Sequence, residues 1–503
     1  MPAACIILST MSCPQPSEAP VSAADLIQLG RHPGPFLLAL DGQTGSAARL
    51  GCDEVVRAIP GKRLVCRGGW QGQPVFAKVY IGSDKYWQAE CRGLQALHAQ
   101  GIAAPAVLHA GTADHGKLHV IVLAAIEPAQ TLASAWEAAS DEAARSELLR
   151  LALATIAAHH AAGLEQGDIH LNNFLLSGGR LYTLDGGGIS TPGVSELSPG
   201  RSRDNLARFF AQFYPRFDAL IDSVLPDYVS QRGWPAGHLT SAVLLPRVRL
   251  FRRRRLRHFL KKIFRECSAF VCSRDWRSFR VCDRELATTG LLQLLADPDA
   301  SLQQTDAHVL KQGNTCTLWS TTVDGRQLVV KRYNIKSLAH RISRMLRRTR
   351  AATSWKNAHR LAMYGILGAR PVALVERRFG PLRGKAWLIM EYVSGDDITR
   401  LCKDPRPDHE TSSRVVRGVT ALLAQLAQCR ISHGDMKGTN FIQSPRGLAV
   451  IDLDAMREHL SDSGFQKRRR RDLQRFMRNW IPCPDIDALF RAALQDNHRV
   501  TET

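Results

Sequence analysis

The chain has 503 residues, of which 45% are hydrophobic and 22% are charged. This length exceeds what one hydrophobic core organises, and the composition is typical of soluble globular domains rather than of disordered or fibrous chains. No apolar run approaches the roughly 20 residues that a membrane-spanning helix needs. The 12 cysteines show neither CxxC pairs nor a metal-binding spacing, so we expect reduced thiols in a cytosolic protein.

The formal net charge of +21 is concentrated in three segments, 201–280, 335–360 and 467–478. The second of these holds 8 Lys and Arg residues and no acidic residue. Localised positive charge indicates an anionic partner, which can be nucleic acid, a membrane surface or a phosphorylated substrate. The alternative is that these segments are solvated surface helices.

The first half of the chain begins with a Pro-, Ser- and Ala-rich stretch, which predicts a flexible leader over residues 1–20. Short apolar runs with Gly-containing breaks then predict an antiparallel sheet, and longer apolar periodicity predicts helices. The predicted strands lie at 63–70, 74–81 and 117–126, and the predicted helices at 84–102 and 140–163.

The second half repeats this order of elements. Its predicted strands lie at 308–323, 326–335 and 385–393, and its predicted helices at 335–365 and 412–431. The polar stretch at 285–305 predicts the linker between the halves. We therefore expect a flexible leader (1–20), a first domain at 21–290 that ends in basic helices, and a second domain at 291–503.

Three polar residues follow the long helix in each half at the same spacing. The first set is Asp168, Asn173 and Asp185, and the second is Asp435, Asn440 and Asp452. The steps are 5 and 12 residues in both sets, and each member of the second set lies 267 positions after its counterpart. Equal spacing in two otherwise divergent segments indicates two copies of one catalytic architecture.

These residue types suit phosphoryl transfer, which needs carboxylate and carboxamide oxygens around Mg²⁺ and a carboxylate that orients and deprotonates the attacking hydroxyl. Asp168 and Asp435 follow a glycine on a short loop, where a carboxylate can face a cleft as the catalytic base. The later residues, Asn173, Asp185, Asn440 and Asp452, offer the hard oxygen atoms that Mg²⁺ prefers.

A lysine stands inside an apolar strand in each half, Lys78 in FAKVY and Lys331 in VVKRY. Burying an ammonium group alone is costly, so each lysine must be paired or must bind an anion. The phosphates of a bound nucleotide are the anion that fits the neighbouring residues.

Together these residues resemble the protein-kinase-like superfamily, with its strand lysine, its D-x-x-x-x-N loop and its later metal-binding aspartate. More narrowly, HGDMKGTNFI, VIDLD and SWKNAHRL resemble the lipopolysaccharide kinase family, which phosphorylates Kdo or heptose sugars of the inner core. The second copy carries the closer match, over roughly 305–480.

This resemblance implies an α+β fold of two tandem protein-kinase-like bilobal domains, each with an antiparallel N-lobe sheet and a helical C-lobe. It also implies ATP and Mg²⁺ as cofactors and a lipopolysaccharide core or lipid-linked sugar as acceptor, at the cytoplasmic face of the inner membrane. A helix glutamate that pairs with the strand lysine is expected, and Glu90 fits this role in the first copy.

The chain departs from the family pattern at several positions. Asn357 stands where the second copy should have its helix glutamate, and Gln166 stands where the second copy has His433. Neither copy has a full GxGxxG, and Gly313 is the candidate remnant of a phosphate-covering loop. Asp204 and Asp472, 19 and 20 residues after the metal aspartates, are expected to brace the catalytic loops. These departures leave open the alternative that one of the two copies is catalytically inactive.

Two basic stretches, 250–264 and 335–348, carry apolar residues at helical spacing. Such amphipathic helices suit an anionic membrane surface, and the alternative is that their apolar stripes face a C-lobe core. No aromatic platform accompanies the charge, which argues against nucleic-acid binding. Two other functions stay open: a kinase-like transferase for a soluble small molecule or protein, and a non-catalytic scaffold in envelope assembly. The sequence indicates no oligomeric state.

Overall fold

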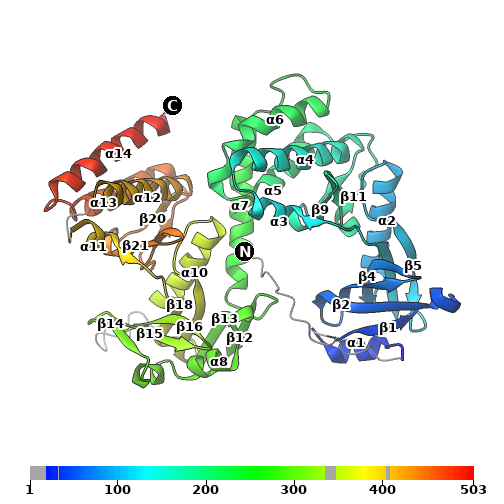
Figure 1. Ribbon diagram of the computed structural model, residues 1–503, viewed down its shortest axis with the longest axis horizontal. Coiled ribbons are helices and arrows are strands. Elements are labelled where there is room, and N and C mark those ends of the chain that lie inside the picture. The colour runs from blue at the N-terminus through cyan, green and yellow to red at the C-terminus, as the bar shows by residue number, and fades with distance from the viewer. Residues whose placement is uncertain (1–18, 32, 335–346, 404–407, 503) are drawn as a thin grey trace. The chain divides into compact units, whose positions relative to one another are not determined.

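The computed structural model describes residues 19–31, 33–334, 347–403 and 408–502 (Figure 1). The chain forms two compact units, Met1–Phe213 with Phe217–Arg252 and Tyr214–Arg216 with Arg253–Thr503. The division falls inside helix α7 (Ser241–Lys262) and so differs from the expected boundary between 290 and 291. Most of the predicted leader lies outside the described residues.

The first unit begins with a six-stranded antiparallel sheet in the order β1-β2-β3-β4-β6-β5. Its strands are β1 (Phe36–Ala39), β2 (Arg49–Ile59), β3 (Arg63–Trp70), β4 (Gln73–Ile81), β5 (Val107–Ala113) and β6 (Leu118–Ala124). Alternate residues of β3, such as Leu64 and Cys66, are buried, as expected for a sheet with one covered face. Beyond β1, Leu40 bridges to Ala113 of β5, so the outer strands approach each other.

The helices of the first unit and a set of short strands complete it. The helices are α1 (Ala23–Leu29), α2 (Lys85–Ala99), α3 (Leu132–Ala138), α4 (Glu142–Ala161), α5 (Pro199–Phe210) and α6 (Leu220–Gln231). The short strands are β7 (Gln130–Thr131), β8 (Glu165–Gln166), β9 (Phe174–Ser177), β10 (Arg180–Thr183) and β11 (Ile189–Ser190). Phe174 and Phe209 meet edge to face in the core of this helical part, directly behind the loops that carry the polar residues.

The second unit contains a seven-stranded sheet in the order β12-β13-β17-β18-β16-β15-β14. Its strands are β12 (Phe270–Arg274), β13 (Ser278–Asp283), β14 (His308–Gln312), β15 (Cys316–Val323), β16 (Arg326–Tyr333), β17 (Pro371–Phe379) and β18 (Leu382–Glu391). Strands β14 to β18 pair in the same order as β2 to β6 of the first unit, as expected of two copies. The copies differ at their edges, because β1 is added beside β2 whereas the β12–β13 hairpin is added beside β17.

The rest of the second unit is helical, with short strands that carry its loops. The helices are α8 (Thr289–Ala296), α10 (Arg350–Met363), α11 (Ile398–Lys403), α12 (His409–Gln428), α13 (Asp462–Met477) and α14 (Pro484–Glu502). The short strands are β19 (Asp396–Asp397), β20 (Ile431–Ser432), β21 (Phe441–Ser444), β22 (Gly447–Val450) and β23 (Arg457–Glu458). Each unit thus joins an antiparallel sheet to a helical part, which confirms the predicted α+β bilobal fold.

Residues 285–305 do not form the linker that was predicted there, because this stretch is part of the second unit. Helix α8 begins after Thr288, whose side chain caps it, and its residues Leu291, Leu294 and Leu295 are buried against the sheet. The polar residues that suggested a linker lie in the turn and 3₁₀ helix that follow.

The apolar stripe of the basic stretch 250–264 is also internal. Leu256, Leu260 and Ile263 of the α7 region are buried in the core of the second unit, and Phe259 packs against the same core. Only the charged side of this stretch is therefore available to a partner. The stripe predicted at 335–348 lies almost entirely outside the described residues. None of the helices in the described part of the chain is both long and apolar enough to cross a membrane.

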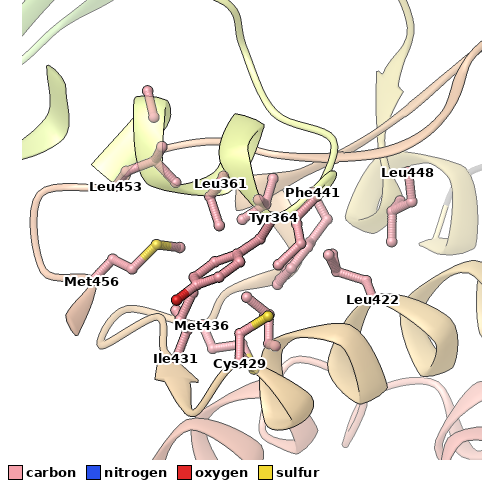
Figure 2. Packing of buried hydrophobic residues seen from close by; sticks show 14 of the residues in the cluster. Leu361, Tyr364, Leu422, Cys429, Ile431, Met436, Phe441, Leu448, Leu453 and Met456 are labelled. Atoms are coloured by element: carbon pink, nitrogen blue, oxygen red, sulfur yellow. The ribbon is translucent and has the colours of Figure 1, made fainter. Parts of the chain in front are cut away.

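The core of the second unit lies directly under its loops. Figure 2 shows the ring of Tyr364 at the end of α10 among Leu361, Ile431, Met436 and Met456. Three of these neighbours come from the segments that surround the second polar set. Packing around Tyr364 therefore holds helix α10 and the loops in one arrangement.

We predict that Tyr364→Ala destabilises the second unit by about 3 kcal/mol or more, because it opens a cavity in a close-packed core. Tyr364→Phe loses only the hydrogen bond from the hydroxyl to Glu458 Oε1 (3.0 Å), at a cost of about 1 kcal/mol. Amide hydrogen exchange is the measurement, with α10 reporting on the second unit and α4 on the first. Equal exchange of α10 in both variants and in the unaltered chain would contradict the account.

Candidate active sites

In the first unit, Lys78 of β4 forms an ion pair with Glu90 of helix α2. The lysine Nζ also donates to the carbonyl oxygen of Leu184, 3.0 Å away, next to Asp185. Both side chains are largely shielded from solvent, with exposed fractions of 12% and 1%. The predicted pairing of strand lysine and helix glutamate is therefore present in the geometry of this unit.

Glu90 also holds the loop that follows Asp185. Its carboxylate accepts hydrogen bonds from the backbone N–H groups of Gly186 (3.1 Å) and Gly187 (3.0 Å). A Cβ atom on Gly93 of α2 would lie 1.8 Å from the carbonyl oxygen of Gly186, so only glycine allows this approach of helix and loop. The same packing accounts for Gly186, where a Cβ atom would lie 2.6 Å from the carbonyl oxygen of Glu90, but not for Gly188, where the nearest atom would be 3.6 Å away.

The three polar residues of the first set come together at the end of the short strands. Asn173 Nδ2 donates to the carbonyl oxygen of Asp168 (2.9 Å), and the carbonyl of Asn173 accepts from the N–H of Leu184. A Cβ atom on Gly188 would lie 3.6 Å from Asp185 Oδ2 and 3.7 Å from Asp168 Cβ. The loop at Gly188 thus lies against both Asp168 and Asp185.

In the second unit, Lys331 of β16 contacts Asp452 directly, with Nζ 2.5 Å from Oδ1. Burial disfavours the charged form of Lys331, but Tyr333 and Asp452 outweigh it, so the pKa of the lysine lies above its ordinary value. Burial likewise raises the pKa of Asp452, but the lysine charge outweighs it, and the net pKa shift is downward. The pair is therefore fully ionised at neutral pH.

Asp452 adopts a left-handed backbone conformation with a φ of 61°. This conformation is uncommon for residues other than glycine, and aspartate and asparagine are among those that tolerate it best. Its counterpart Asp185 has a φ of −111°, so the two copies present this carboxylate from different backbones. Non-glycine residues in such conformations often occur at functional sites.

Asn357 of α10 takes the place of a helix glutamate by reversing the direction of the hydrogen bonds. Its side-chain Nδ2 donates to the carbonyl oxygens of Leu453 (2.8 Å) and Met456 (2.9 Å). In the first unit Glu90 accepts from two N–H groups of the corresponding loop. In both units this helix is thus tied to the loop after the aspartate that is predicted to bind metal. Glu90 of the first helix also pairs with the strand lysine, whereas in the second unit the strand lysine pairs with that aspartate, Asp452.

Arg350 and Asp454 add an ion pair that the sequence reasoning did not single out. Arg350 is the first residue of α10, and its guanidinium lies over the ring of Tyr333, 5.1 Å from the ring centroid. Lys331 Nζ lies at the same distance from that centroid. Around the ring of Tyr333, the second unit therefore holds two cations, Lys331 and Arg350, and each is paired with an aspartate. In the sequence, the second aspartate of the VIDLD motif, Asp454, indicates this additional ion pair.

Asp435 lies between two cationic side chains. Lys437 Nζ donates to its Oδ2 (3.1 Å), and Arg475 of α13 lies 2.5 Å from its Oδ1. Asn440 Nδ2 donates to the carbonyl oxygen of Asp435 (2.8 Å), which repeats the contact between Asn173 and Asp168. The carboxamide nitrogen is used in both units, so the carboxamide oxygen is the atom left to bind a cation.

Asp472 braces the second catalytic loop, as expected. Its carboxylate accepts from the N–H groups of His433 (2.7 Å) and Gly434 (3.0 Å), while His433 Nε2 lies 3.0 Å from the carbonyl oxygen of Ile451. Burial raises the pKa of this carboxyl above its ordinary value, against the hydrogen bonds from the loop.

The expectation that Asp204 braces the catalytic loop of the first unit is wrong. Asp204 forms ion pairs with Arg203 (3.5 Å) and Arg247 (3.7 Å). Its neighbour Asn205 takes the bracing position and donates from Nδ2 to the carbonyl oxygen of Gln166 (2.8 Å). Asn205 lies 267 positions before Asp472, so the constant offset between the copies was the signal that identifies it.

Gly313 lies in the turn between β14 and β15. Its N–H donates to the carbonyl oxygen of Cys316 (3.1 Å), and its own carbonyl accepts from Asn334 Nδ2 (2.9 Å). These bonds define a closed hairpin turn at the edge of the sheet. Its role as a phosphate-covering loop stays a prediction.

The donors in each unit suit a magnesium ion that shares its ligands with a nucleotide. Within the described residues, no three His, Cys, Asp or Glu side chains converge as a metal-binding group. Each unit offers one carboxylate and one carboxamide oxygen, Asp185 with Asn173 and Asp452 with Asn440. Mg²⁺ is bound in this way where phosphates and water supply the other ligands.

The ion pair between Lys331 and Asp452 predicts a pH dependence of stability. Folding lowers the pKa of Asp452, so the ion pair contributes to the free energy of unfolding above the pKa of an aspartate in the unfolded chain, about 4. This contribution is lost as the pH falls through the pKa of Asp452 in the folded chain. We predict that Asp452→Asn lowers stability at neutral pH and makes its fall in acid shallower. Urea unfolding from pH 7 to pH 3 tests this. Parallel curves for the two chains would contradict it.

Comparison with known proteins agrees with this geometry. The model of the "Lipopolysaccharide kinase (Kdo/WaaP) family" matches residues 83–185 and 300–500, which contain both polar sets. No curated protein matches the chain by sequence. A solved structure described as "WaaP in complex with acyl carrier protein" is 21% identical, with a TM-score of 0.25. The matched region covers 41% of this chain and 81% of the chain in that structure. Because the matched ranges span more than half of its length, the chain belongs to the lipopolysaccharide kinase (Kdo/WaaP) family.

Proposed function

We propose that the protein transfers the γ-phosphoryl group of ATP to a sugar hydroxyl, Kdo or heptose, of the lipopolysaccharide inner core. The acceptor would be reached at the cytoplasmic face of the inner membrane. The observation that carries this proposal is the site of the second unit, where a buried lysine, a metal-type aspartate and a loop aspartate are assembled in a member of this kinase family.

In the second unit, Asp435 would orient the acceptor hydroxyl and take its proton as the oxygen attacks the γ-phosphorus. The bond between that phosphorus and the bridging oxygen breaks, and ADP leaves with the electron pair. Lys331 would leave Asp452 and hold the phosphates, with Gly313 covering them. Asn440 and Asp452 would hold Mg²⁺, which neutralises phosphate charge when bound.

The first unit would use Asp168, Asn173, Asp185 and Lys78 in the same roles, with Glu90 holding the lysine. Its catalytic loop is built differently, because Gln166 replaces His433 and a carboxamide, Asn205, replaces the bracing carboxylate. We propose that the second unit turns over and that the first binds nucleotide with little or no turnover.

We predict that Asp435→Asn lowers the rate of phosphoryl transfer by about 10²–10⁴-fold, the usual contribution of a general base. Asp168→Asn, the matched change in the first unit, is expected to lower it by less than about 10-fold. Steady-state kinetics on purified core acceptor gives both rates. A larger loss from Asp168→Asn would assign turnover to the first unit instead.

A second prediction concerns the product in cells. Mass spectrometry of the lipopolysaccharide core is expected to show one phosphate fewer in cells without the protein and in cells that carry Asp435→Ala. An unchanged phosphate count in every strain would reject core phosphorylation. If the deleted strain lost the phosphate and the Asp435→Ala and Asp168→Ala chains each restored it, the protein would be a non-catalytic scaffold. If the purified protein phosphorylated only a soluble small molecule or a protein, it would be a kinase-like transferase for that acceptor.

A further inference from the structure

Two hairpins of the second unit carry an exposed aromatic residue side by side at their tips. Trp276 lies in the turn between β12 and β13, and Phe379 lies at the turn between β17 and β18; they are 62% and 67% exposed. Their rings meet edge to face with centroids 5.6 Å apart. Large apolar side chains that stay exposed together mark interaction surfaces.

The sheet holds these tips in place. Strand β13 pairs with β17, with Ser278 opposite Arg377, so the two turns leave the sheet together. The N–H of Gly380 donates to the carbonyl oxygen of Trp276 (2.9 Å). A Cβ atom on Gly380 would lie 2.7 Å from the indole ring, so the ring rests on the glycine backbone. The aromatic pair is thus a built feature and not two loose side chains.

Arginine side chains crowd behind the aromatic pair. Arg378 and Arg274 both lie over the ring of Phe279, at 4.5 Å and 5.2 Å from its centroid. Burial lowers the pKa of Arg383, and the nearby Arg378, Arg348 and Arg274 lower it further, against Glu376. Four guanidinium groups that repel one another favour the binding of an anion among them.

The acidic residues near this cluster are already engaged. Glu376 is 1% exposed and accepts from Arg378 and from Thr349 Oγ1 (2.6 Å). Asp275 accepts from the backbone of its own turn, from the N–H groups of Arg277 (2.6 Å) and Ser278 (2.7 Å). The four arginine residues outnumber these two carboxylates, so the surface keeps a net positive charge.

We propose that this hairpin surface, formed by Trp276, Phe379, Arg274, Arg348 and Arg383, docks on the phosphate groups of an anionic lipid bilayer. Tryptophan favours the boundary between lipid headgroups and acyl chains, and arginine residues near a surface are attracted to anionic lipid. The two aromatic rings form a single pair and not a row on which successive bases would stack. The apolar side of the basic stretch 250–264 is in the core, so the hairpin surface replaces it as the candidate for membrane docking.

This inference extends the membrane-face part of the proposed function, and it is tested without nucleotide so that the two can fail separately. The full chain is sedimented with vesicles of phosphatidylcholine mixed with phosphatidylglycerol, and with phosphatidylcholine alone. Binding is expected on the anionic vesicles only and is expected to weaken with salt. The Asp435→Ala chain is expected to bind as the unaltered chain does.

Two double variants address the surface, Trp276→Ser with Phe379→Ser and Arg274→Gln with Arg383→Gln. Each is expected to lower partitioning roughly 10-fold or more, because the first removes the aromatic side chains that favour the bilayer boundary and the second removes two charges that attract anionic lipid. The matched controls are Leu460→Ser, which removes a 72% exposed leucine, and Arg257→Gln with Lys261→Gln on the charged side of α7. Both controls are expected to bind as the unaltered chain does.

Retained binding in the two hairpin variants would overturn the proposal, as would equal binding to neutral vesicles. Loss of binding in the α7 variant alone would place the docking surface on that helix and also overturn it. If the hairpin variants lost binding to single-stranded RNA but not to vesicles, the surface would be a nucleic-acid site.

Discussion

A buried ammonium group in the sheet of each half is the constraint on which the rest of both sites depends. Lys78 and Lys331 lie in corresponding strands, and burying an ammonium group is costly unless an anionic group pairs with it. The first unit supplies that carboxylate from its helix and the second from the metal-type aspartate. In the proposed reaction the first lysine would therefore keep its partner when phosphates bind, whereas the second would exchange Asp452 for a phosphate. This difference makes the two halves unequal before any substrate is considered.

The helix beside each sheet is tied to the same loop by opposite means. Glu90 accepts two hydrogen bonds from the loop, and Asn357 donates two to it. Because an asparagine brings no charge, the second unit places its extra ion pair elsewhere, between Arg350 at the start of α10 and Asp454. Thr349, which caps that helix, is hydrogen-bonded to Glu376 at the arginine-rich hairpin surface. The start of α10 thus joins the catalytic site to the surface that we assign to the membrane.

Much of the site was predictable because its residues keep a strict spacing. The offset of 267 pairs Asp168 with Asp435 and Asp185 with Asp452, and the structure brings each set together. The same offset identifies Asn205, which was missed because the position directly before it is an aspartate, Asp204. The partner of Lys331 could not be predicted, since it depends on a left-handed backbone at Asp452 that no local motif specifies. The place of the β12–β13 hairpin in the sheet was missed because strand pairing across almost a hundred residues, such as Ser278 with Arg377, leaves no periodic signal in sequence.

The central claim is that each half forms a nucleotide site around its strand lysine. Isothermal titration calorimetry of the full chain with Mg²⁺ and ADP measures this most directly. The account predicts two sites per chain, one of which disappears in Lys78→Met and the other in Lys331→Met. Binding that both lysine variants leave unchanged, or no binding at all, would contradict it.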